Sequence, residues 1–178
     1  MGQICLKFQM RGRKRSQGSS LSVGGGRLGR RGRGHYTAHL GPVLASLEAL
    51  GAEGVQIGTR FALTQESSAS EAFKKLCLNL NEGDTKLLLK KVSPTRLINN
   101  ALMQQIQEAE HRGASADELR EIVGKGKAKL GIFEGDIEHG ELEIGQVASL
   151  FKGREIETVS QVMQEIVDEY YATRNRLV

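Results

Sequence analysis

The most constraining feature of the sequence is a helix-like stretch followed, after a short turn, by an apolar run that ends in glycine. Apolar residues recur at helical spacing at Val43, Leu44, Leu47 and Leu50. Pro42 suits the first turn of that helix, and Gly51 suits its C-terminal cap. The run Gly54-Val55-Gln56-Ile57-Gly58 is typical of a short, buried parallel strand. A helix, a turn and such a strand form the second half of a βαβ unit, so the sequence predicts an α/β fold with a parallel sheet.

Charge is divided sharply between the start of the chain and the remainder. Nine Lys or Arg and no Asp or Glu precede Glu48, which leaves 16 of the 25 basic residues against all 21 acidic ones, a net charge of −5. The overall charge of +4 therefore comes from the Gly/Arg-rich start. Residues 1–41 carry too little apolar side chain to offset the entropy of ordering them, and we expect this segment to be disordered.

The basic segment also has a functional interpretation, as a tail that neutralises nucleic-acid phosphates. Aromatic residues make up only 4% of the chain, and the remainder is acidic. These features do not favour nucleic acid as a partner.

The residues after the apolar run are predicted to be mostly helical. A strand is expected at Asp84–Val92. Helices are expected from N-cap residues and apolar periodicity at Ser70–Leu78, Ser93–Arg112, a stretch capped by Ser115 and Glu118, Gln146–Phe151 and Glu155–Arg174.

Chemistry is most strongly indicated where the apolar run ends. A glycine directly after a buried strand allows a ligand to approach the backbone closely, because no Cβ intervenes. The backbone N–H groups of Gly58 and Thr59, with the Thr59 hydroxyl, are suited to hold phosphate oxygens. Taken alone, one Gly-Thr pair is more typical of an ordinary turn at a strand end.

Three separated motifs resemble one family in the same order. The string from Leu50 to Phe61 resembles the last strand and phosphate loop of the nitronate monooxygenase family, formerly called 2-nitropropane dioxygenase. Ser93–Leu102 is similar to the family's post-barrel helix. Gly135-Asp136-Ile137-Glu138, followed by Gly145-Gln146-Val147-Ala148, is similar to a segment near the family's C-terminus. The resemblance runs from about Pro42 to Tyr170.

The resemblance implies a C-terminal fragment of an FMN-binding (β/α)8 TIM barrel followed by a mostly helical C-terminal extension. Residues 42–92 would be the last helix and strand of the barrel, with its FMN phosphate loop, and residues 93–178 the extension. Gly58 and Thr59 would contact the FMN 5′-phosphate, and Gln56 would lie near the flavin. The complete family oxidises alkyl nitronates, small-molecule substrates, with FMN and dioxygen.

The catalytic part of the family has no counterpart here. The family's catalytic His belongs to an earlier strand that this sequence does not match, so no catalytic residue and no metal ligand are assigned. His35, His39, His111 and His139 fall at polar positions typical of solvated surface histidines. We therefore expect a partial nitronate monooxygenase-like flavoprotein, an oxidoreductase by family, that is inactive alone.

Two alternatives stay open. The family includes flavin-type enoyl-acyl-carrier-protein reductases, which would use NAD(P)H and an enoyl thioester, and the chain also resembles a fragment of these. From a different class, it is a non-catalytic remnant or an interaction module with a basic tail.

The cellular setting is inferred from cysteines and hydropathy. Cys5 and Cys77 lie far apart in sequence and are expected to be two reduced thiols. No apolar run approaches the ~18 residues needed to span a membrane. We expect a cytoplasmic chain with no membrane partner.

Overall fold

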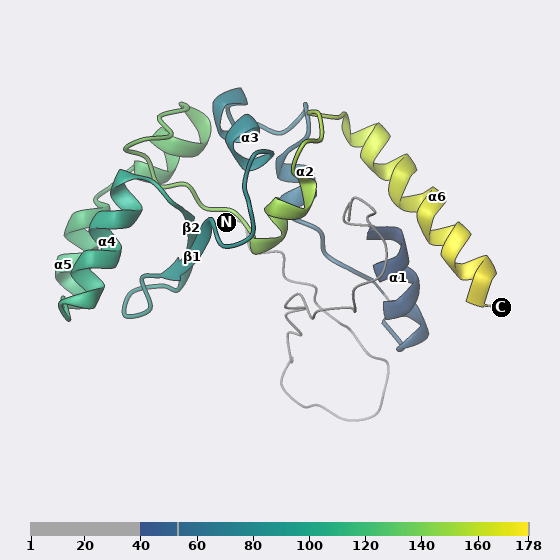
Figure 1. The fold of residues 1–178 in the computed structure, drawn as a ribbon, viewed down its shortest axis with the longest axis horizontal. Coiled ribbons are helices and arrows are strands. Elements are labelled where there is room, and N and C mark those ends of the chain that lie inside the picture. Colours follow the sequence, from purple (N-terminus) through teal and green to yellow (C-terminus); the bar gives the residue numbers. More distant parts are fainter. Residues whose placement is uncertain (1–39, 53, 178) are drawn as a thin grey trace.

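The structure, a computed structural model, describes residues 40–52 and 54–177, which form helices and one small sheet (Figure 1). The elements in chain order are α1 (Leu40–Ala49), α2 (Thr59–Ala62), α3 (Glu71–Cys77), β1 (Thr85–Leu88), β2 (Thr95–Ile98), α4 (Ala101–His111), α5 (Ala116–Val123), the π-helix η1 (Lys129–Phe133), the 3₁₀-helix η2 (Gln146–Phe151) and α6 (Val159–Leu177). They form an arch, with α4 and α5 at one end and α1 and α6 at the other (Figure 1). The segment expected to be disordered is residues 1–41, of which 1–39 lie outside the described part. The expectation is wrong for Leu40 and Gly41, which form the start of α1.

The first and last helices pack together at one end of the arch. They approach closely at Gly41, where an added Cβ would lie 2.3 Å from the Cβ of Glu169. The Gly41 N–H also donates to Glu169 Oε2 at 3.1 Å. Helix α1 was expected from the apolar periodicity after Pro42, and Gly51 follows it with a φ of +92°, as a C-terminal glycine should.

Helix α6 begins at Val159, four residues later than the predicted start at Glu155. The delay has a physical cause, because the carboxylate of Glu66 accepts the Val159 N–H at 2.9 Å and the Thr158 hydroxyl accepts the Gln161 N–H at 3.2 Å. These contacts satisfy amides that a helix start leaves unpaired.

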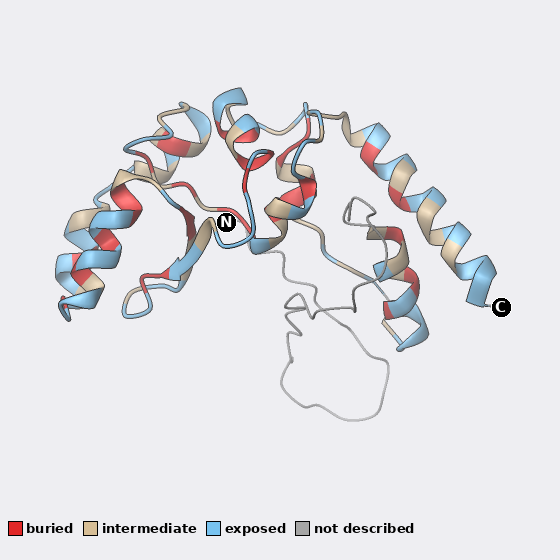
Figure 2. Cartoon of the chain, in the orientation of Figure 1, coloured by how far each residue is buried: buried red, intermediate tan, exposed pale blue. Residues whose placement is uncertain are grey.

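The centre of the arch holds the larger of two hydrophobic cores (Figure 2). Helix α3 contributes Phe73 and Cys77, and η2 contributes Phe151, each at most 1% exposed. The predicted N-cap of α3 is confirmed, because Ser70 Oγ accepts the Phe73 N–H at 3.2 Å. This core lies against α2 through Leu63, which immediately follows that helix.

The second core lies between the β-hairpin and the helices α4 and α5. Here the predicted helix Ser93–Arg112 is wrong up to Asn100, because Thr95–Ile98 forms β2, antiparallel to β1. The helix starts only at Ala101, where Asn100 Oδ1 accepts the Met103 N–H at 2.9 Å. The extended start before Asn100 buries Leu97 and Ile98 in the cores, and this long-range burial overrides the helical spacing.

Strand β1 ends earlier than predicted. It stops at Leu88, and Leu89 has a φ of +58°, a left-handed conformation rare for a leucine. This turn buries both Leu88 and Leu89, at 7% and 4% exposure, whereas a continuing strand would send them to opposite faces.

The strand predicted over Gly54–Ile57 is not formed. Residues 54–58 connect α1 to α2 without regular structure, and the sheet of the described part consists of β1 and β2 alone. A parallel strand exists only through hydrogen bonds to neighbouring strands, and none lies beside this segment among the described residues.

The capping box predicted for α5 is confirmed, with reciprocal bonds between Ser115 and Glu118 at 2.8 and 3.2 Å. The sequence did not predict the π-helix η1. It lies against the following loop, and the backbones of Gly131 and Gly140 meet there. None of the helices in the described residues is long and apolar enough to cross a membrane.

We expect Gly140→Ala to destabilise the chain by about 1–3 kcal/mol or more, because overpacking against backbone cannot be relieved by a side-chain rotation. Its Cβ would lie 2.2 Å from Gly131 Cα and 2.4 Å from Gly131 N. Gly54→Ala is the matched control, since its Cβ would meet nothing within 4 Å. Equal urea midpoints for the two variants would contradict the close backbone contact.

Candidate functional site

The sequence-predicted site residues lie just before and at the start of α2. Gly58 is the residue before the helix and provides no side-chain cap, and Thr59 is its first residue. Thr59 is fully buried, yet its hydroxyl Oγ1 has no hydrogen-bond partner in the part of the chain that is described. A buried hydroxyl left unpaired costs about 1–3 kcal/mol, so this oxygen is suited to a hydrogen bond that the protein itself does not supply.

Gln56 lies two residues before Gly58, in the irregular connection from α1, and its side chain is exposed. The structure thus brings Gly58 and Thr59 together at one turn. It does not place Gln56 in that turn, because the strand that was to align it is not formed.

Helix α2 is a single turn and has little local support. The Ala62 N–H donates to the Gly58 carbonyl at 2.9 Å, and Thr64 donates to the Phe61 carbonyl from its N–H and its hydroxyl. One isolated turn is unstable in water, because nucleation orders several residues for very few hydrogen bonds. Contacts from elsewhere in the chain must therefore fix this turn.

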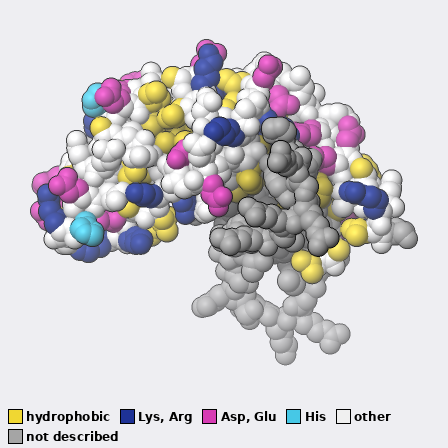
Figure 3. Space-filling model, in the orientation of Figure 1, with side chains coloured by type: hydrophobic (Ala, Val, Ile, Leu, Met, Phe, Trp, Pro, Cys, Tyr) yellow, Lys and Arg dark blue, Asp and Glu magenta, His cyan; other side chains and the backbone are white. Residues whose placement is uncertain are grey.

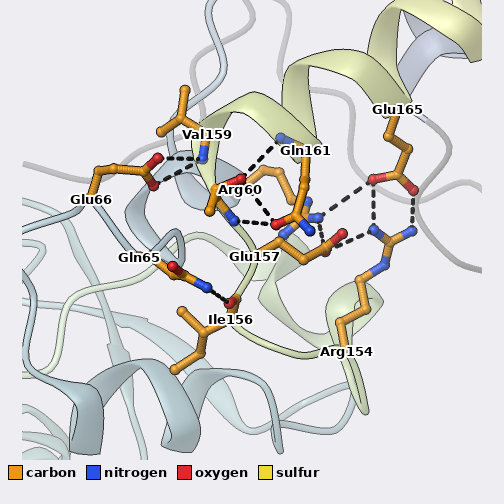
Figure 4. A network of polar contacts seen from close by, with 10 residues as sticks. Arg60, Gln65, Glu66, Arg154, Ile156, Glu157, Val159, Gln161 and Glu165 are labelled. Atoms are coloured by element: carbon orange, nitrogen blue, oxygen red, sulfur yellow. Dashed lines mark hydrogen bonds and ion pairs between the residues drawn. The ribbon is translucent and has the colours of Figure 1, made fainter.

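One of those contacts is made by Arg60, whose side chain is 1% exposed (Figure 4). Its Nη2 pairs with Glu157 Oε2 and lies 3.4 Å from Glu165 Oε2. Its guanidinium carbon lies 5.3 Å from the centroid of the Phe151 ring, within cation–π distance.

A second arginine completes this charged cluster. Arg154 Nη1 lies 2.7 Å from Glu165 Oε2 and 3.4 Å from Glu157 Oε2, and Arg154 Nη2 also pairs with Glu165. Two cations and two anions therefore share one largely buried region, and their formal charges cancel. We call Arg60, Arg154, Glu157 and Glu165 the four-charge cluster.

The proton affinities of the cluster follow from these pairs. Hydrogen bonding from Arg154 holds the pKa of Glu165 below its ordinary value of 4.5, and the charge of Arg60 acts in the same direction. The hydrogen bond to Glu165 in turn raises the pKa of Arg154. Both groups are therefore charged at neutral pH.

The residues after α2 are also tied to the start of α6. Gln65 donates its N–H to the Glu157 carbonyl at 2.9 Å and its side-chain amide to the Ile156 carbonyl at 3.0 Å. The buried amine of Lys74 donates to the Ser67 carbonyl at 2.8 Å and the Gln65 carbonyl at 3.3 Å. The residues after α2 are thus held by the segment before α6 and by Lys74 of α3, in addition to the bonds within the turn.

Sequence reasoning missed the four-charge cluster. Arg60 was noted only as part of the Gly-Thr-Arg-Phe string, and its partners are about a hundred residues away. One signal was present in α6, where Glu165 falls between the buried Val162 and Ile166 on the inner face of an amphipathic helix. A charge at such a position indicates a buried partner.

The other His and Cys side chains of the described residues do not form a second site, and Cys5, His35 and His39 lie outside the described part. His111 and His139 are exposed as predicted, and His139 Nδ1 lies 3.3 Å from Asp136 Oδ1. Cys77 is a free, buried thiol whose pKa is raised by burial to about 12, so it is a poor nucleophile. Within residues 40–52 and 54–177, no group of three His, Cys, Asp or Glu is placed to hold a metal ion.

Hydrophobic side chains reach the surface at the end of the arch formed by α1 and α6 (Figure 3). An open groove of about 390 Å³ runs between these helices, and its lining includes Leu44 and Met163. Val55, from the segment where a strand was predicted, also lines it. The groove is therefore continuous with the residues that lead to Gly58.

Comparison with known proteins agrees with the order of the motifs. The sequence model of the family described as nitronate monooxygenase matches residues 41–169, well over half of the chain. The chain belongs to the nitronate monooxygenase family, which is a family of oxidoreductases.

Individual relatives match only part of their own length. A probable nitronate monooxygenase of Staphylococcus aureus (strain Newman) is 38% identical over 96 residues, which are 50% of this chain and 26% of that relative. FabK from Thermotoga maritima is 32% identical with a TM-score of 0.68, covering 77% of this chain and 43% of FabK. Nitroalkane oxidase from Streptomyces ansochromogenes is 23% identical with a TM-score of 0.60, covering 78% of this chain and 38% of the oxidase, and shows a similar fold. The chain spans about a quarter of the curated relative and less than half of each solved structure.

Stability should fall in acid through Glu165. Its pKa is lower in the folded chain than the ordinary 4.5, so the unfolded chain takes up the proton first as pH falls. The stabilisation that the charged Glu165 provides is complete above its ordinary pKa. It is lost as the pH falls through the lower pKa that Glu165 has in the folded chain. We expect Glu165→Gln to cost about 1–3 kcal/mol near neutral pH and less in acid, measured by urea denaturation.

Glu71→Gln is the matched control, because Glu71 forms only an exposed pair with Lys75 on α3. Exposed pairs of this kind contribute about 0.3–0.5 kcal/mol. If the two variants lost the same stability at neutral pH, the four-charge cluster would not hold α6.

Proposed function

We propose that this chain is the C-terminal part of an FMN-binding (β/α)8 barrel of the nitronate monooxygenase family, followed by its helical extension. In this proposal, Gly58 and Thr59 bind the FMN 5′-phosphate. The complete protein oxidises alkyl nitronates, and this chain contributes cofactor binding rather than proton transfer.

The observation that carries the proposal is the unpaired hydroxyl of Thr59. It is buried, it directly follows Gly58, and it lies in the string that resembles the family's phosphate loop. A phosphate oxygen would accept the hydrogen bond that the described chain leaves unmade. Donors to an ionised acceptor form hydrogen bonds about twice as strong as neutral pairs, so the phosphate would offset the cost of burying this group.

The residues of this chain would act by binding and orientation. Gly58 lets the phosphate approach the backbone without a Cβ, and Thr59 supplies its N–H and hydroxyl. FMN supplies, when bound, the redox chemistry that transfers electrons from the nitronate to dioxygen. Gln56 is proposed to approach the flavin once residues 54–57 are held in a sheet.

Two features support the inference that these residues complete a larger fold. The segment 54–58 has the β-rich composition of a strand but no strand beside it among the described residues. The groove that continues from it is largely apolar, and Met163 and Tyr171 in its lining are 46% and 53% exposed. Exposed apolar surface next to an unpaired strand sequence is typical of a face that a neighbouring part of the fold covers.

The proposal predicts opposite effects of one substitution on binding and stability. Thr59→Val should weaken FMN binding about 10- to 100-fold, the loss of a hydrogen bond to a charged group of about 1.5–3 kcal/mol. It should leave the melting temperature unchanged or slightly raised, because it removes a buried hydroxyl that has no partner. Flavin fluorescence titration and thermal denaturation measure the two effects.

The controls separate the phosphate from the flavin ring. Thr59→Ser keeps the hydroxyl and should bind FMN nearly as well as the wild type. Riboflavin, which lacks the phosphate, should bind more weakly than FMN and equally to all three proteins. A wild-type chain that does not bind FMN better than riboflavin would refute the phosphate site and favour a non-catalytic remnant.

Activity measurements test the division of roles. We expect the chain alone to consume no alkyl nitronate in the presence of FMN and dioxygen, because no residue here matches the family's catalytic His. Turnover by the chain alone would contradict this. In the complete protein, nitronate consumption without reduced nicotinamide would distinguish nitronate oxidation from the enoyl-acyl-carrier-protein reductase alternative.

A further inference from the structure

Arg60, which follows the candidate phosphate ligand Thr59, has a charged side chain that is almost completely buried. Arg60 comes directly after Thr59 in the single-turn helix α2, yet its charged end is 1% exposed. It turns away from its own helix toward residues of the C-terminal segment (Figure 4). A charge is buried this completely only where partners compensate its desolvation.

Residues from three separate segments contact the guanidinium group of Arg60. Phe151 of η2 presents its ring 5.3 Å from the guanidinium carbon. Glu157 belongs to the connection before α6, and Glu165 to α6 itself. Arg154 pairs with both carboxylates and so fixes their positions independently of Arg60. Arg60 therefore meets two carboxylates that a second arginine also contacts.

We propose that Arg60 is a positioning residue for the phosphate loop. By anchoring the first turn of α2 to the C-terminal segment, it holds the Gly58 and Thr59 backbone and the Thr59 hydroxyl in the orientation that phosphate binding needs. This role rests on the function proposed above for Gly58 and Thr59. The C-terminal extension then belongs to the cofactor site, although it supplies no ligand.

The local structure explains why an anchor is required. Helix α2 is four residues long and Gly58 gives it no side-chain cap. Apart from Arg60, the side-chain bond that closes the turn runs from Thr64 Oγ1 to the Phe61 carbonyl at 2.8 Å, at the far end from the loop. The N-terminal end, where Thr59 lies, is therefore fixed chiefly through Arg60.

The contacts are specific to arginine. Its planar group reaches two carboxylates from one nitrogen while its face lies against an aromatic ring. Lysine would keep the charge but lose the planar face, and methionine would lose both. The formal charges of the cluster still cancel after Arg60→Lys. After Arg60→Met, Arg154 still pairs with both carboxylates, but one negative charge is left over, so Arg60→Lys is the variant that separates the charge from the arginine geometry.

The first measurement needs no ligand. Hydrogen exchange of the full chain is followed at the amides of Ala62 and Thr64, whose bonds close the α2 turn. Arg60→Met should speed exchange at these amides about tenfold or more, with Arg60→Lys between it and the wild type, while α4 and α5 exchange as before. Arg120→Met, which removes an exposed pair on α5, is the control and should leave α2 unchanged.

The second measurement uses FMN and riboflavin as probes. Arg60→Met should weaken FMN binding about tenfold and leave riboflavin binding unchanged, with partial recovery in Arg60→Lys. A purely structural role would weaken both flavins alike, and that result would overturn the proposal.

The two measurements distinguish a failure of the proposed phosphate site from a failure of the positioning role of Arg60. If the wild type does not prefer FMN to riboflavin, the phosphate site itself fails. If the amides of Ala62 and Thr64 exchange equally slowly in the wild type and in Arg60→Met, the positioning role is refuted, whatever the result of the flavin titrations.

Discussion

The burial of one guanidinium between two distant carboxylates is the constraint on which this arrangement depends. Arg60 lies near the start of the described chain, and Glu157 and Glu165 lie near its end. Leaving any of these charges buried and unpaired would cost several kcal/mol, so α2 and the C-terminal segment must pack together or both must rearrange. Gln65 donates to the Ile156 carbonyl and Glu66 accepts from the Val159 N–H, and these hydrogen bonds join the same two segments.

Features encoded by neighbouring residues could be predicted from the sequence. Ser70 caps α3, Ser115 and Glu118 form their capping box, and Gly51 follows α1 with a positive φ value. Each signal acts within four or five residues, so the chain around it decides the outcome. The family motifs were equally readable, because they depend on the identity and order of residues rather than on their folded contacts.

Features that depend on distant partners could not be predicted. Thr95–Ile98 has a spacing compatible with a helix and forms a strand because β1 and the two cores bury it that way. Residues 54–57 have the composition of a strand and form none, because no neighbouring strand accompanies them in the described part. The four-charge cluster joins residues about a hundred positions apart, and no local pattern specifies such a pairing.

The buried polar side-chain atoms of the described residues that lack a hydrogen-bond partner belong to residues of the sequence motif. In the part of the chain that is described, the buried side-chain atoms without a hydrogen-bond partner are Thr59 Oγ1 and Arg60 Nη1. They belong to consecutive residues of the Gly-Thr-Arg-Phe string. Local violations of hydrogen-bond pairing are expected where function, not stability, selects the residue. The motif and the unpaired buried atoms coincide at one turn, and this coincidence is the basis of the proposed phosphate site.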